Sequence, residues 1–191
     1  MKIWHEVWDY IKMIIIVVAI VLVINNVVLI NAKIPSPSME KTIMTGDRIF
    51  GFRLAYGINL DLFGHEISKK WKDPERFDII VFPYQYEENT YYIKRIIGLP
   101  GETVQVVDGY VYINGSRLES DIYGNELMDD PMAASQPITL GEDEYFVLGD
   151  NRNHSQDSRD PSVGEVKKDT IMGKAWVRIY PFDKMGVIRH E

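Results

Sequence analysis

Two serines flanked by prolines form the first pattern with a chemical use. They lie in residues 34–39, which read IPSPSM. Proline fixes its own backbone and biases the preceding residue toward an extended conformation. The pattern predicts a rigid, extended segment that can present a serine hydroxyl as a nucleophile. A plain linker would have the same composition, so this segment alone leaves both interpretations open.

A lysine in an otherwise apolar strand forms the second pattern, in residues 91–97 (YYIKRII). Side chains alternate along a strand, so Lys94 and Arg95 point to opposite faces. Burial would disfavour the charged form of Lys94 and lower its pKa from about 10.4, as a lysine general base requires. Arg95 cannot serve as a base, because a guanidinium does not deprotonate in proteins. On an edge strand, Lys94 would instead point to water.

A polar run, residues 149–159 (GDNRNHSQDSR), is the third pattern. It follows an apolar run at residues 145–148. This composition predicts a loop held by side-chain hydrogen bonds, in which Asp157 pairs with Arg159 and Ser155 orients an amine. An ordinary surface loop is the alternative.

Short β-rich runs separated by turn signals must position these segments. The predicted strands are residues 48–52, 78–82, 91–97, 103–107, 110–113, 145–148 and 174–179. The dipeptide Asp108-Gly109 between two of them is a strong hairpin signal. Strands at this spacing, with no long amphipathic helix among them, predict an all-β sandwich or barrel. Residues 119–141 are acidic and show no periodicity, so we interpret them as a surface insertion without chemistry.

An apolar run at residues 11–30 precedes the β-rich part. About 20 residues of helix span about 30 Å, the hydrocarbon thickness of a bilayer. We interpret the run as an uncleaved transmembrane anchor. A buried core helix would be apolar on one stripe only, and a cleaved signal peptide would end in a small-x-small motif. The chain then divides into a short N-terminal segment (residues 1–10), the anchor (11–30) and a β domain (31–191). A second candidate for bilayer contact is the group Trp176, Tyr180 and Phe182, which we assign instead to the core.

Composition excludes several classes of function. The chain of 191 residues has a net charge of −7, which is unsuited to binding nucleic acid. It contains no cysteine, so disulfides, thiolate metal sites and a cysteine nucleophile are excluded. The four histidines do not pair at metal-ligand spacing, and we predict neither a metal nor another cofactor.

Taken together and in this order, the three segments resemble the signature motifs of bacterial type I signal peptidases. In that family a Pro-Ser-x-Ser-Met motif follows the membrane anchor, and a Tyr-Ile-Lys-Arg strand leads into Gly-Leu-Pro-Gly. A Gly-Asp-Asn-Arg-x-x-Ser-x-Asp-Ser-Arg motif closes the set. All three occur here, as residues 35–39, 92–101 and 149–159, and the similarity extends to about Trp176.

The resemblance implies a serine peptidase with Ser38 as nucleophile and Lys94 as unprotonated general base. The backbone N–H of Ser38 and the hydroxyl of Ser36 would bind the oxyanion. Ser155 would hold the lysine amine in line with the nucleophile. Three further residues would support the loop around the site: Asp150, Asp157 and Arg159.

The resemblance also implies the substrate and its setting. The substrate would be the signal peptide of an exported preprotein, cut after an Ala-x-Ala-type site and bound as an added β-strand. The residues expected to contact it are Ile34, Pro35, Met39, Tyr91, Tyr92 and Ile93. The enzyme would lie in the cell membrane near the secretion translocon, with residues 1–10 cytoplasmic and the β domain extracytoplasmic. Tethering both enzyme and substrate to the bilayer raises their effective concentration.

Other interpretations stay open at this point. Residues 38–41 (SMEK) match the S-x-x-K element of penicillin-binding proteins, with Lys41 standing where the signal peptidase family usually has proline. A Ser38–His154–Asp157 triad is also conceivable, because such triads are recognised by geometry rather than by order. A soluble self-cleaving regulator could use the same Ser-Lys pair, but the anchor argues against it. A non-catalytic membrane-tethered β domain, such as a scaffold or surface protein, is the remaining alternative.

Overall fold

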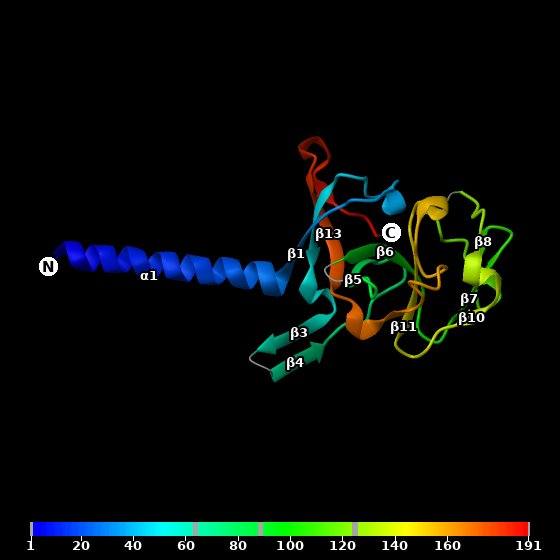
Figure 1. Ribbon diagram of the computed structural model, residues 1–191, viewed down its shortest axis with the longest axis horizontal. Helices are drawn as coiled ribbons and strands as arrows, with labels where there is room; N and C mark the ends of the chain where they lie inside the picture. Colours follow the sequence, from blue (N-terminus) through cyan, green and yellow to red (C-terminus); the bar gives the residue numbers. More distant parts are fainter. Residues whose placement is uncertain (1, 63–64, 88–89, 124–125, 191) are drawn as a thin grey trace.

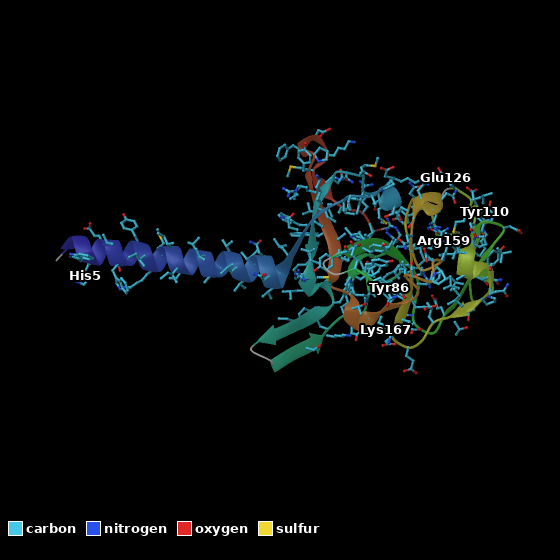
Figure 2. The ribbon with its side chains drawn as sticks, viewed as in Figure 1. His5, Tyr86, Tyr110, Glu126, Arg159 and Lys167 are labelled. Atoms are coloured by element: carbon cyan, nitrogen blue, oxygen red, sulfur yellow. The ribbon has the colours of Figure 1, made fainter. Side chains whose placement is uncertain are left out.

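An exposed helix leads into a β-rich domain in the computed structural model (Figure 1). The structure describes residues 2–62, 65–87, 90–123 and 126–190. Helix α1 (Lys2–Val23) continues through a π-helical turn (Ile24–Val28) into strand β1 (Leu29–Lys33). The span Trp4–Val28 has a mean hydropathy of 2.7 and is long enough to cross a membrane. Its side chains project outward along the helix, and the apolar window of the span is not buried in protein (Figure 2).

The main sheet runs in the order β1-β2-β13-β5-β6-β11-β12, and β14 pairs with β13. Its strands after β1 are β2 (Arg48–Phe52), β5 (Ile79–Pro83), β6 (Tyr91–Gly98), β11 (Glu144–Leu148), β12 (Val166–Lys167), β13 (Gly173–Tyr180) and β14 (Gly186–Val187). Strand β6 lies between β5 and β11, and both pairings are antiparallel. The register opposes Lys94 to Ile80 of β5 and Arg95 to Leu148 of β11.

A smaller sheet and a separate hairpin complete the strands. The smaller sheet is ordered β10 (Ile138–Thr139), β7 (Thr103–Val107), β8 (Tyr110–Ile113) and β9 (Ser116–Arg117). Asp108 and Gly109, which join β7 to β8, have φ values of 51° and 78°, as a two-residue type I′ hairpin requires. Strands β3 (Gly57–Leu62) and β4 (His65–Lys70) form the hairpin. The 3-10 turns are Pro37–Met39, Arg53–Ala55, Met132–Ser135, Arg152–His154, Lys168–Thr170 and Phe182–Lys184.

The predicted fold class, a β domain preceded by one apolar helix, is confirmed. Strands β2, β7 and β8 have the predicted bounds, and the ends of the other four predicted strands differ by one residue. Strand β1 was not predicted, because its apolar residues Leu29 and Ile30 read as a continuation of the anchor. The hairpin of β3 and β4 was also missed, because charged residues interrupt its alternation.

Two expectations about burial were wrong. Residues 119–141 are not only a surface insertion, because Met128, Ala134 and Leu140 are buried and pack against the smaller sheet. The aromatic group Trp176, Tyr180 and Phe182 is not in the core, since these residues are 48%, 48% and 77% exposed. The first two lie on β13, which is separated by β2 from β1, the strand that follows the apolar helix.

Candidate active site

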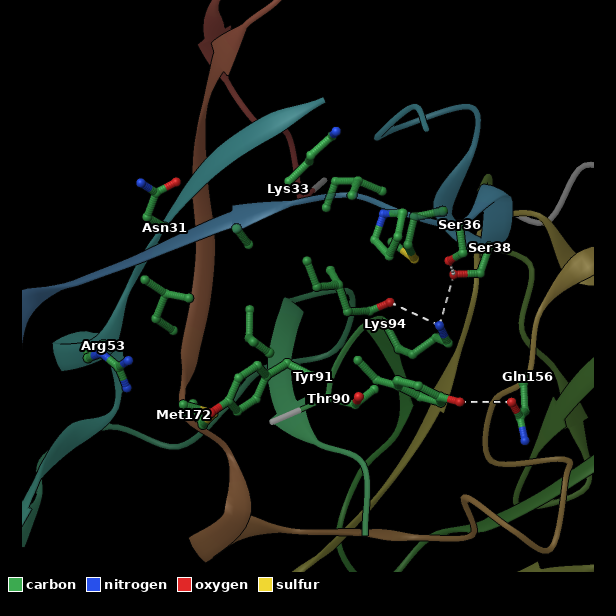
Figure 3. Close-up of a pocket in the computed structure, with 18 of the residues that line it drawn as sticks. Asn31, Lys33, Ser36, Ser38, Arg53, Thr90, Tyr91, Lys94, Gln156 and Met172 are labelled. Atoms are coloured by element: carbon green, nitrogen blue, oxygen red, sulfur yellow. Dashed lines mark hydrogen bonds between the residues drawn. The ribbon is translucent and has the colours of Figure 1, made fainter. Parts of the chain in front are cut away.

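Ser38 and Lys94 meet at the centre of the main sheet. Ser38 lies in the 3-10 turn that follows β1, and Lys94 lies in the middle of β6. The Lys94 amine donates a hydrogen bond of 2.9 Å to Ser38 Oγ, and a second of 3.2 Å to the carbonyl of Ile93 (Figure 3). Both residues are buried, with exposures of 7% for Ser38 and 4% for Lys94. The segment therefore presents its hydroxyl to a desolvated amine rather than to water.

The surroundings of Lys94 favour its neutral form. Burial lowers the pKa of the Lys94 ammonium from 10.5 to about 8, while the more distant Asp157 and Asp150 carboxylates raise it by a smaller amount. No described carboxylate forms an ion pair with this amine, whose nearest aromatic neighbour is the Tyr92 ring at 4.9 Å. The lowered pKa makes the unprotonated amine, which proton abstraction from a hydroxyl requires, far more accessible near neutral pH than in an exposed lysine.

Ser36 stands beside the nucleophile candidate. Its backbone is extended, with φ −125° and ψ 157°, and its Oγ lies 3.3 Å from Ser38 Oγ (Figure 3). Proline on both sides of Ser36 holds this conformation. The hydroxyl of Ser36 thus lies directly beside that of Ser38, and its role as an oxyanion donor stays a prediction.

The loop after β11 closes around the serine through backbone contacts. The N–H of Asn151 donates to the carbonyl of Ser38, and the Asn151 side chain donates to the carbonyl of Pro37, both at 3.1 Å. Gly149 has no room for a side chain: an added Cβ would lie 2.3 Å from the Ser38 carbonyl oxygen and 2.2 Å from Ser155 Oγ. The polar loop and the serine segment therefore pack backbone against backbone.

Paired charges hold this loop in shape. Asp157 accepts from the backbone N–H of Gly149 and binds Arg159 at 2.8 and 3.0 Å, and both side chains are buried. Arg159 also donates to the carbonyl of Arg152. The predicted pairing of Asp157 with Arg159 is present, and the carboxylate reaches the loop backbone rather than the lysine.

Arg95 connects five segments on the opposite face of β6. Its guanidinium binds both oxygens of Asp150 at 2.8 and 2.7 Å, and its side chain is fully buried. It also donates to the hydroxyl of Thr42, three residues after the end of the serine turn, and its guanidinium lies 3.4 Å from the centre of the Tyr123 ring. The remaining contacts are with the carbonyls of Phe77 and His190. The sequence analysis excluded Arg95 as a base but did not anticipate this role.

Residues 119–141, which were assigned no chemistry, contact two buried arginines, Arg152 and Arg95. Asp121 binds Arg152 through two hydrogen bonds of 2.7 and 2.8 Å, and both side chains are nearly buried. Tyr123 packs its ring on Arg95. Asp121 and Tyr123 are far from these partners in sequence and belong to no periodic element, so no sequence pattern could have identified the contacts.

A cleft of about 740 Å³ opens beside the pair. All the residues predicted to contact substrate line it: Ile34, Pro35, Met39, Tyr91, Tyr92 and Ile93. Strand β11 pairs with β6 only from Arg95 onward, whereas β5 pairs with residues 91–95. In the described sheet, the second edge of β6 at residues 91–93 therefore has no partner strand.

The other predicted participants lie nearby but in different arrangements. Ser155 Oγ is buried without a hydrogen-bond partner among the described residues, and its role in holding the lysine stays a prediction. His154 is exposed, and its ring nitrogen lies 3.3 Å from the side-chain oxygen of Asn151 rather than near Asp157. Lys41 pairs with Glu126 at 3.8 Å and has a φ of 95°, which a proline could not adopt. Neither His154 nor Lys41 donates to Ser38 in the described contacts.

Comparison with known proteins identifies the family of the chain. The family described as "Signal peptidase, peptidase S26" matches residues 7–180. The chain is 35% identical to a signal peptidase I of Rickettsia bellii, over 86% of this chain and 70% of that protein. It is 30% identical to a signal peptidase I of Bacillus licheniformis, over 95% of this chain and 92% of that protein. A crystal structure of a signal peptidase I from Enterococcus faecalis is 40% identical and covers 54% of this chain and 97% of that chain, with a TM-score of 0.45. Because the family match spans most of its length, the chain belongs to the signal peptidase family, peptidase S26.

Proposed function

We propose that this chain is a membrane-anchored serine endopeptidase that removes signal peptides from exported preproteins, with Ser38 as nucleophile and Lys94 as general base. The observation that carries the proposal is the 2.9 Å hydrogen bond from a buried lysine amine to a buried serine hydroxyl. Desolvation supplies the neutral amine, and the hydrogen bond supplies the path for the proton.

The reaction follows from these positions. Ser38 Oγ attacks the scissile carbonyl while Lys94 takes the hydroxyl proton, and the oxyanion is bound by the Ser38 N–H and the Ser36 hydroxyl. The protonated Lys94 then gives its proton to the leaving amine, and water cleaves the acyl-enzyme with Lys94 again as the base. The contacts of Ser38 Oγ with the Lys94 amine at 2.9 Å and with Ser36 Oγ at 3.3 Å support this division of roles.

The substrate lies extended across the cleft. The unpartnered edge of β6 at residues 91–93 supports its binding as an added strand between β6 and residues 34–36. The buried apolar side chains of Ile34 and Met39 line the cleft, which supports small apolar residues such as alanine at the two specificity positions of an Ala-x-Ala-type site.

The bilayer is the second partner. We propose that residues 11–30 anchor the chain, that residues 1–10 are cytoplasmic and that the β domain is extracytoplasmic, near the translocon. The exposed apolar helix and the exposed aromatic residues Trp176, Tyr180 and Phe182 support contact with lipid.

Cleavage of a preprotein in lipid tests the proposal. The full-length chain is reconstituted and incubated with a preprotein that carries an Ala-x-Ala site, beside Lys94→Met and the exposed-lysine control Lys167→Met. We expect cleavage after the second alanine by the wild type and the control, and none by folded Lys94→Met. Cleavage by Lys94→Met would assign the base to another residue, with His154 and Lys41 to be replaced next. If the folded wild type does not cleave, the chain is a non-catalytic membrane-tethered β domain.

A further inference from the structure

The cleft that holds Ser38 and Lys94 continues to the end of the membrane helix. Its lining includes Asn25 of the π-helical turn and Leu29 of β1, together with Ser38 and Lys94 at the other end. Figure 3 shows Asn31 and Arg53 on one side of the cleft and the reactive pair on the other. Residues 29–36, taken as an extended chain, cover about 25 Å. The catalytic cleft is thus a groove that leads from the membrane boundary to the nucleophile.

Arg53 is the cation at the membrane end of this groove. It lies in the 3-10 turn after β2, and its Nε donates a hydrogen bond of 3.2 Å to the carbonyl of Leu29. Its two other guanidinium nitrogens make no hydrogen bond with a described residue, although the residue is only partly exposed. An arginine held by one nitrogen can donate its remaining N–H groups to acceptors in the groove.

The end of α1 shows which hydrogen-bond acceptors occur at the membrane end of the groove. Asn26 donates its side-chain amide to the carbonyl of Leu22 at 2.8 Å, so a side-chain amide already binds a helix carbonyl at this end of the membrane helix. The neighbouring Asn25 lines the groove instead. A second apolar helix that ended beside α1 would present its own unsatisfied carbonyls to Asn25 and Arg53.

We propose that Arg53, assisted by Asn25, binds the C-terminal carbonyls of the apolar helix of the substrate's signal peptide. This inference rests on the proposed function and adds a binding site remote from the scissile bond. A helix of this kind carries negative partial charge at its C-terminus, which a cation stabilises. The apolar part of a signal peptide ends shortly before the cleavage site, and the residues between them lie extended along the groove.

A lipid phosphate is the competing ligand for Arg53. Arg53 also lines a second cavity of about 280 Å³, together with Lys70 and Lys168. Lys168 is already paired with Asp73, and Asp169 adds a negative charge to the same lining. Of these three cations, Arg53 is the one that also lines the catalytic groove. The geometry therefore favours the substrate over a lipid phosphate as its ligand.

Two substrates separate a remote binding site from an effect on catalysis. One is a preprotein with its complete signal peptide, and the other is a short peptide that spans only the cleavage site. Full-length wild type and Arg53→Gln are assayed on both in vesicles of zwitterionic lipid. We expect kcat/KM of Arg53→Gln on the preprotein to fall about 10- to 100-fold, mainly through KM, and cleavage of the short peptide to change less than twofold.

Matched variants make each outcome decisive. Arg48→Gln, at an exposed position of β2, the strand that precedes the Arg53 turn, should leave both substrates unaffected. An equal loss by Arg53→Gln on both substrates would overturn the inference, because Arg53 would then act on the fold or the reactive pair. A loss that appears only when the vesicles contain anionic phosphatidylglycerol, and that Lys70→Gln shares, would overturn it in favour of a lipid phosphate. Failure of the folded wild type to cleave either substrate would overturn the proposed function itself and this inference with it.

Discussion

Two adjacent cations on β6, Lys94 and Arg95, are both buried, yet their surroundings differ completely. Arg95 is bound through two hydrogen bonds by the buried carboxylate of Asp150 and is covered by the ring of Tyr123. Lys94 faces the open cleft, and its side-chain acceptors are one hydroxyl and one carbonyl. One side of the strand balances its cation with a counter-charge, and the other side leaves the lysine without one, so that burial lowers its pKa to about 8.

The difference shows how a single strand can combine support with reactivity. A buried charge needs a partner to remain charged, so Arg95 can hold distant segments together only because Asp150 is present. A buried lysine without a partner lies poised between its two protonation states, which makes it reactive and leaves the folded state less stable. Structural and catalytic roles therefore follow from which face supplies a carboxylate.

Replacing Lys94 by arginine should produce the largest effect. Lys94→Arg keeps the positive charge and most of the volume but cannot deprotonate, so kcat/KM for preprotein cleavage should fall about 10⁴-fold or more. Initial rates in lipid, with folding checked by circular dichroism, measure this. Retention of a tenth of the activity would mean that Lys94 serves only as a cation, like its neighbour.

Removing the counter-charge on the other face should mainly affect stability. Asp150→Asn leaves the buried guanidinium of Arg95 without its carboxylate, and the free energy of unfolding should fall by about 3–5 kcal/mol. Urea denaturation in detergent micelles measures the change. Asp73→Asn, which removes an exposed partner of Lys168, is the control and should lower it by less than about 1 kcal/mol. Equal effects would remove the distinction between buried and exposed pairs.

Ser36→Ala tests the side of the site that faces the cleft and leaves the base, Lys94, unchanged. Loss of one oxyanion donor should lower kcat about 10²- to 10³-fold with little change in KM. Ser36→Thr, which retains a hydroxyl, should recover part of the loss. An unchanged kcat in Ser36→Ala would leave the Ser38 N–H as the oxyanion donor and assign Ser36 a structural role.

The stability of Lys94→Met should depend on pH in a defined direction. The pKa of Lys94 is about 8 in the folded chain against 10.5 as its ordinary value, so the unfolded state binds more protons between these values. The resulting penalty is complete below pH 8 and decreases as pH rises toward 10.5. Lys94→Met should therefore be more stable than the wild type by roughly 2–3 kcal/mol at pH 7, with a smaller difference at pH 10. Denaturation at both pH values measures this, and a less stable variant at pH 7 would contradict a desolvated Lys94.

Tyr123 gives the smallest expected effect. Its hydroxyl is buried without a partner in the described structure, whereas its ring lies 3.4 Å from the Arg95 guanidinium. Tyr123→Phe should therefore change the free energy of unfolding by less than about 0.5 kcal/mol, while Tyr123→Leu should lower it by about 1–2 kcal/mol. The two variants are compared by urea denaturation, and equal losses would mean that the hydroxyl and not the ring supports Arg95.

The sequence predicts local features of this molecule well and long-range features poorly. Strand alternation placed Lys94 and Arg95 on opposite faces, and the Asp-Gly dipeptide located the hairpin of β7 and β8, because both depend only on neighbouring residues. The contacts of Asp121 with Arg152 and of Tyr123 with Arg95 join segments that are remote in the chain and not periodic, so no local rule reveals them. Trp176 was assigned to the core because aromatic residues are usually buried, whereas here its strand face is exposed.

Gly149 has a consequence for how the enzyme can evolve. Because the Ser38 carbonyl and Ser155 occupy the space of any side chain at this position, even alanine would push the nucleophile segment away from the base. Position 149 should therefore tolerate no substitution in a library selected for activity, while residues that line the outer groove, such as Thr90 and Met172, should accept many. New cleavage preferences can then arise by substitutions along the groove, while the lack of a side chain at Gly149 keeps Ser38 at its distance from Lys94.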